Sequence, residues 1–86
     1  MDFDDQLRRY FGSADLDALT PDALADGVDR MRVDLGLETD RGRRFALWSL
    51  LFLLGHAPDL DRVFEDPADR DAARTFMDLA ERGDPG

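Results

Sequence analysis

The residues of this chain best suited to bind a ligand are three arginines in the segment Arg41-Gly42-Arg43-Arg44. This segment lies at the predicted start of a helix, where free backbone N–H groups add to the attraction of guanidinium groups for anions. Arg41, Arg43 and Arg44 are therefore candidate contacts for a phosphate, a nucleic acid or an acidic peptide. The alternative is neutralisation within the chain, which carries 20 acidic residues against 11 basic ones. Because the glycine spacing matches no phosphate-binding loop, we favour that alternative.

His56 is the only histidine of the chain. It follows Gly55, which is predicted to end a helix, and the negative end of the helix dipole favours an imidazole there. A metal site would have to draw on Asp59 and Asp61, which gives one nitrogen and two oxygens without a second histidine. The aspartate-rich segment 66–71 lacks the glycine and the closing glutamate of an EF-hand. We therefore expect no metal and no cofactor, and we interpret His56 as part of a helix cap.

The sequence does not supply the parts of a nucleophilic catalytic site. It has one histidine, no cysteine and no nucleophile-elbow motif around its few hydroxyl side chains. Two carboxylates can act together as acid and base, but no spacing marks a pair as buried, and so acidic a composition is typical of a solvated surface. We expect no catalytic residues and predict that the protein is not an enzyme.

The strongest structural signal is the apolar run from Phe45 to Leu54, in which Ser49 is the only polar residue. In a helix these side chains point in all directions around the axis, so the helix must be covered on every side. Its own chain could cover it, or a second copy could complete the cover. Because an 86-residue chain buries a modest share of its surface, and oligomers favour two-fold symmetry, we favour a homodimer. The candidate interface residues are Trp48, Leu51, Phe52, Tyr10 and Phe11.

Apolar residues recur at helical spacing along most of the chain, and no stretch alternates long enough to predict a strand. Cap signals such as Thr20-Pro21, and glycines such as Gly36, mark where helices begin and end. We predict an all-α bundle of four main helices plus one or two short helical turns, with a hydrophobic central helix. The main helices are expected at residues 2–11, 21–35, 40–54 and 67–82, with a turn near 59–65.

Within these helices, pairs such as Asp26–Arg30 and Asp66–Arg70 have the i,i+4 spacing of stabilising ion pairs. The apolar stripes predict the core. Its members are expected to be Leu7, Phe11, Leu24, Val28, Met31, Leu47, Trp48, Leu51, Phe64, Phe76 and Leu79.

Composition narrows the class of protein further. The net charge of −9 opposes binding to a phosphate backbone, so we expect no direct nucleic-acid binding. The apolar run is about half as long as the ~20 residues that a membrane helix needs, so no membrane association is expected. The absence of cysteine favours the cytoplasm. Arginine is the only basic side chain besides the histidine, which favours a GC-rich bacterial source. We expect one domain over residues 1–82 and a frayed tail over 83–86.

These observations predict a small cytoplasmic protein–protein interaction module whose partner is a second copy, another protein or both. The alternative is an acidic protein that imitates nucleic acid and inhibits or regulates a DNA- or RNA-binding partner. A small-ligand-binding protein or an enzyme, with a pocket beside Trp48 and the arginines of 41–44, is the interpretation we favour least.

Overall fold

The computed structural model describes residues 3–13 and 15–82. Within these ranges the chain forms no strand. Its helices are α1 (Phe3–Phe11), the short 3-10 helix η1 (Leu16–Ala18), α2 (Pro21–Leu37), α3 (Arg41–Leu53), α4 (Leu60–Val63) and α5 (Pro67–Arg82). The predicted all-α fold is confirmed, and the main helices end within two residues of their predicted bounds wherever those bounds are described. The predicted start at residue 2 and the expected tail at 83–86 lie outside the described residues.

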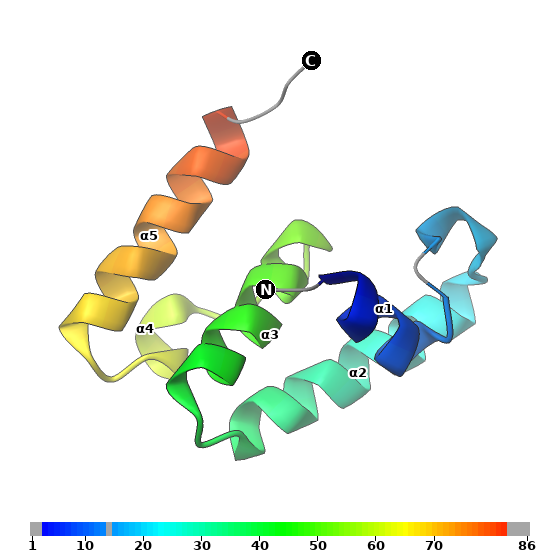
Figure 1. The fold of residues 1–86 in the computed structure, drawn as a ribbon, viewed down its shortest axis with the longest axis horizontal. Coiled ribbons are helices and arrows are strands. Elements are labelled where there is room, and N and C mark those ends of the chain that lie inside the picture. The colour runs from blue at the N-terminus through cyan, green and yellow to red at the C-terminus, as the bar shows by residue number, and fades with distance from the viewer. Residues whose placement is uncertain (1–2, 14, 83–86) are drawn as a thin grey trace.

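The apolar helix α3 occupies the middle of the fold (Figure 1). On one side α2 packs against α3, and α1 packs against α2. On the other side α5 packs against α3, with the short α4 beside it. The molecule is flat, with extents of 37 × 35 × 20 Å. Among the described residues, no helix combines the length and the apolar character that crossing a lipid bilayer requires.

The helices begin where the sequence places their caps. The side chains of Thr20, Asp40, Asp59 and Asp66 each accept a hydrogen bond from a backbone N–H two or three residues further on, at 2.8–3.1 Å. Each bond satisfies one of the N–H groups that a helix start leaves without an intrahelical acceptor. The cap predicted at Thr20 is therefore confirmed, and bonds of this short range explain why helix starts can be predicted from local sequence.

The end of α3 is also fixed locally. Gly55 has a φ of +82°, a conformation that is strained for residues with a Cβ. Its N–H donates to the carbonyl of Phe52 at 3.0 Å, and the N–H of His56 donates to the carbonyl of Leu51 at 2.9 Å. This pair of bonds is a Schellman motif. His56 thus caps the helix through its backbone, and its imidazole is exposed.

The predicted end of α2 at Gly36 is wrong. The helix continues through Gly36 to Leu37, and the N–H of Glu38 still donates to the carbonyl of Asp34 at 2.8 Å. The glycine does not take the left-handed conformation, because Glu38 leaves the helix through extended backbone instead. A glycine permits a left-handed helix end but does not impose one.

The core consists of side chains from α1, α2, α3, α5 and the segment after α4. Seven of the predicted core residues are buried, and Phe11, Leu24 and Phe76 are partly buried. Leu79 is the exception, since it is 61% exposed. Residues 46–51 are all buried by neighbouring helices of the same chain, so a second copy is not needed to cover the middle of α3. The core also includes five residues outside the predicted core set: Tyr10, Leu35, Ala46, Leu50 and Ala73.

Gly27 lets α1 lie close to α2. A Cβ built at this position would lie 2.0 Å from a ring carbon of Phe11. The absence of a side chain at Gly27 therefore makes room for the Phe11 ring, and the packing of α1 depends on it.

Candidate functional site

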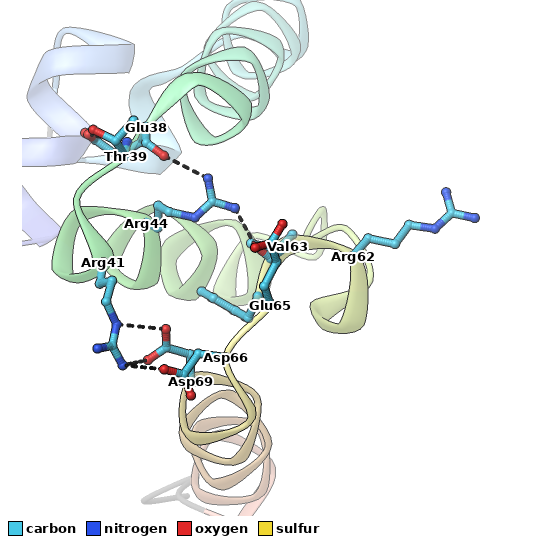
Figure 2. A pocket seen from close by; sticks show the side chains of 10 residues that line it. Glu38, Thr39, Arg41, Arg44, Arg62, Val63, Glu65, Asp66 and Asp69 are labelled. Atoms are coloured by element: carbon cyan, nitrogen blue, oxygen red, sulfur yellow. Dashed lines mark hydrogen bonds and ion pairs between the residues drawn. The ribbon is translucent and has the colours of Figure 1, made fainter.

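Two of the three candidate arginines border a cavity of about 430 Å³ between the end of α2, the start of α3 and the segment that joins α4 to α5 (Figure 2). Trp48 is not among its lining residues. Those residues are Glu38, Thr39, Arg41, Arg44, Arg62, Val63, Phe64, Glu65, Asp66 and Asp69.

Arg41 forms an ion pair with Asp69 in the first turn of α5, and both residues line the cavity. Its Nε and Nη2 atoms donate to the two carboxylate oxygens of Asp69 at 3.1 and 2.8 Å, and Nη2 lies 3.4 Å from an oxygen of Asp66. Hydrogen bonding to Arg41 holds the pKa of Asp69 below its ordinary value, and the same bond raises the pKa of Arg41. The fork of this guanidinium is therefore already occupied by a carboxylate of its own chain.

Arg44 is bonded to the backbone. Its Nη1 atom donates to the carbonyls of Leu35 at 3.1 Å and Glu38 at 2.8 Å, and its Nη2 atom donates to the carbonyl of Val63. These carbonyls belong to the end of α2 and the end of α4, where helices leave carbonyl groups without intrahelical partners. Arg44 therefore joins two helix ends to α3, and its role in this structure is to position them.

Arg43 lies elsewhere. Its guanidinium is exposed and has no bonded partner in the described part of the chain. It lines a different cavity, of about 300 Å³, together with Gln6, Arg9 and Tyr10. The structure thus separates the three candidate anion contacts instead of gathering them around one ligand.

The charges of the larger cavity do not favour an anion. Four acidic side chains line it against three arginines, and Figure 2 shows Arg62 extending away from it. Arg41 and Arg44 would have to leave their present partners to bind an external anion. Within residues 3–13 and 15–82, no group of three or more histidine or acidic side chains is placed to hold a metal ion. The arginines that line this cavity therefore bond α3 to the ends of α2 and α4 and to the start of α5.

Tyr10, a candidate interface residue, is buried between α1 and α2. Its hydroxyl donates to a carboxylate oxygen of Asp34 at 2.6 Å, and its carbonyl accepts a bond from Arg30. Burial raises the pKa of Tyr10 to about 12, with a further contribution from the bond to Asp34 and its negative charge. The predicted Asp26–Arg30 pair is not formed, because Arg30 reaches the backbone of α1 instead. Tyr10 therefore ties α1 to α2.

Trp48 and Leu51, two further interface candidates, lie inside the chain. Trp48 is 1% exposed, and its indole N–H donates to the carbonyl of Pro58 at 3.0 Å. It is the centre of an aromatic cluster between α3 and α5, with ring centroids 5.6–6.5 Å from its own. The cluster consists of Phe45, Trp48, Phe52, Phe64 and Phe76.

Phe52 and Phe11 are the interface candidates that keep part of their surface exposed. Phe52 lies at the edge of the aromatic cluster, with its ring 6.1 Å from that of Phe76 on α5. Phe11 lies over Gly27 on the other side of the molecule. An interface role remains a prediction for these two residues, and they do not belong to one surface.

The sequence does not predict the apolar surface that α5 leaves exposed. Ala73 is the only residue of this helix that is fully buried, and Leu79, which was predicted to be in the core, is exposed. The signal was present in the sequence, because the apolar side chains of α5 spread around more of the helix than one neighbour can cover. The sequence does not show where α3 lies against α5, and this position decides which side chains of α5 are buried.

No family model, no curated protein and no solved structure matches the chain.

Proposed function

We propose that this protein is a protein–protein interaction module that binds helical surfaces, self-associates, and has no catalytic activity of its own. The observation that carries the proposal is the exposed side chain of Leu79 on α5, about one helical turn from the partly buried Phe76, whose ring lies 6.1 Å from that of the partly buried Phe52. Leucine and phenylalanine side chains that gather at an edge of the core are typical of docking surfaces, whereas single exposed apolar residues are ordinary.

The polar groups support the same conclusion. Two of the three arginines that could have bound a small anion are engaged, Arg41 with Asp69 and Arg44 with backbone carbonyls. Arg41 and Arg44, two of the residues predicted to contact a ligand beside Trp48, therefore hold neighbouring helices together. The absence of cysteine supports a cytoplasmic location, in which a small domain does without disulfides.

Self-association is tested by sedimentation equilibrium of the whole chain, from low to high micromolar concentration. Because association follows mass action, the mean mass should rise towards that of a dimer as concentration increases. A mass that stays at that of one chain throughout the range would contradict self-association.

A second candidate function is imitation of nucleic acid. It is supported by the exposed carboxylates of Asp22, Asp26 and Asp29, which follow one another at spacings of four and three residues along α2. A partner bound in this way should lose affinity steeply as salt is added. A complex whose affinity does not change with salt would favour docking through the apolar surface instead.

A further inference from the structure

The apolar surface of α5 is wider than the part that the chain covers. At 100° per residue, apolar and small side chains extend around about 200° of the helix, from Thr75 to Met77. The charged side chains occupy the other side, except for Asp69, which is bonded to Arg41 in the first turn. The half that faces α3 contains Ala73 and the partly buried Phe76 and Met77.

The uncovered half is an exposed flank of four residues at spacings of four, three and four: Ala68, Ala72, Thr75 and Leu79. We name it the α5 flank. This spacing is that of the contact positions in helices that pack along each other. All four residues are exposed, and Leu79 is the only large side chain among them.

We infer that the α5 flank is covered by the α5 flank of a second copy, with the two helices antiparallel about a two-fold axis. This inference rests on the proposed function, and it specifies both the surface and the register. A two-fold axis that crosses α5 between Ala73 and Arg74 places Leu79 opposite Ala68 of the second copy. It places Ala72 opposite Thr75. Each large side chain then meets a small one, so the flank is complementary to itself, as a two-fold interface must be.

The charges at the ends of the helix agree with this register. Arg82 near the end of α5 comes close to Glu65, just before the start of α5, in the second copy. Both side chains are exposed, and neither has an ion-pair partner in the described part of its own chain. The two-fold axis forms this opposite-charge contact twice, and the antiparallel arrangement also brings opposite ends of the helix dipoles together.

The matching test is Leu79→Arg, with Leu37→Arg as the control. Both leucines are exposed on helices, Leu79 at 61% and Leu37 at 74%, so neither substitution should disturb the core. We expect Leu79→Arg to weaken dimerisation about tenfold or more, because two arginines would be placed against the small residues of the interface. Leu37→Arg should leave the dimer unchanged. Sedimentation equilibrium gives the dissociation constants, and circular dichroism verifies that each variant is folded.

The outcomes separate this inference from the proposed function. If the unsubstituted chain stays a monomer at all concentrations, self-association itself is refuted. If it dimerises and Leu79→Arg dimerises equally well, the α5 flank is refuted while self-association stands. If Leu37→Arg is the variant that prevents dimerisation, the interface lies on α2 and the inference is again wrong.

The register is tested with spin labels on single cysteines, which are unique because the chain has no cysteine. Asp71→Cys lies near the proposed axis, and Glu81→Cys lies far from it. A rise of 1.5 Å per residue predicts separations along the axis of about 7 Å between the two labels at 71 and about 22 Å between the two at 81. A distance between the labels at 71 that is clearly shorter than the distance between the labels at 81 supports the antiparallel register. Equal distances at the two positions would mean a parallel pair and would overturn it.

Discussion

The helices on the two sides of α3 are held in place by different kinds of contact. On one side, α1 and α2 are joined by polar bonds and by close backbone approach: Tyr10 to Asp34, Arg30 to the Tyr10 carbonyl, and Phe11 over Gly27. On the other side, α5 meets α3 through aromatic rings and, at its start, through the ion pairs of Arg41 with Asp66 and Asp69, and it buries little of its own surface.

Because of this difference, we expect the two sides of the molecule to have different roles. Directional bonds between α1 and α2 specify one arrangement in a single copy of the chain. Ring contacts between α3 and α5 are less directional and leave apolar area at their edge. A surface that docks another helix is therefore expected on the α5 side, and substitutions on the two sides should behave differently.

The largest effect is expected from Trp48→Ala, which removes the centre of the aromatic cluster. Loss of so large a buried side chain should lower the free energy of unfolding by about 3–5 kcal/mol. Urea unfolding followed by circular dichroism measures it. Phe52→Ala, at the partly exposed edge of the same cluster, should cost clearly less. Equal losses at the two positions would mean that Trp48 is not the centre of this packing.

Arg44→Ala tests the hydrogen bonds by which Arg44 holds the ends of α2 and α4 to α3. Three hydrogen bonds from a charged donor to backbone carbonyls would be lost, and we expect a loss of about 2 kcal/mol in the free energy of unfolding. Arg43→Ala, one residue away and exposed, should change stability little. Arg44→Lys should recover only part of the loss, because an ammonium group cannot reproduce the guanidinium fork. Similar stability of the Arg43 and Arg44 variants would refute the positioning role.

The pKa of Tyr10, raised to about 12, predicts a loss of stability in alkaline solution. The unfolded chain ionises its tyrosine near pH 10, whereas the folded chain holds the proton to a higher pH. The contribution of Tyr10 is therefore complete below pH 10 and is lost as the pH rises towards 12. We expect a loss of about 1–2 kcal/mol, less than the full shift gives, because the exposed Asp34 is screened by solvent.

Tyr10 is the only tyrosine, so its phenolate absorbance reports the pKa directly. Tyr10→Phe should remove this part of the alkaline loss. An absorbance midpoint near pH 10 in the folded protein would contradict the burial of the hydroxyl.

Two glycines of α2 make a matched pair. Gly27→Ala must displace the Phe11 ring, and overpacking of about 1–3 kcal/mol exceeds the gain of about 0.5–1 kcal/mol from helix propensity, so we expect a net loss. Gly36→Ala meets open space and should stabilise by that gain. Adding Phe11→Ala should abolish the loss that Gly27→Ala causes. Stabilisation by Gly27→Ala in the unsubstituted background would show that α1 does not approach α2 this closely.

Ser49 is fully buried, and its hydroxyl has no hydrogen-bond partner among residues 3–13 and 15–82. Ser49→Ala removes an unsatisfied polar group and raises helix propensity, so a gain of about 1 kcal/mol is expected. Ala46→Ser, which places a hydroxyl at another buried position of α3, should have the opposite sign. Destabilisation by Ser49→Ala would indicate that the hydroxyl has a partner in solution.

The sequence by itself determined where the helices lie. Thr20, Asp40 and Gly55 act within a few residues of their own positions, and that is why the start of α2 and both ends of α3 could be predicted closely. Periodicity identified most of the core for the same reason. At Gly36 the local sequence does not determine how the helix ends, because a glycine allows two ways to end a helix and the following backbone selects one.

Only the tertiary structure decided what the polar side chains bind and which apolar ones stay exposed. Arg70 has an aspartate at i−4, yet it donates to the carbonyl of Phe64 at 2.7 Å, and Arg41 bonds Asp69 from a distant part of the chain. The apolar width of α5 was present in its sequence, but whether Leu79 faced the core depended on where α3 lies against it. Local sequence sets the backbone of each helix, whereas the burial of a side chain is a property of two helices and of the angle between them.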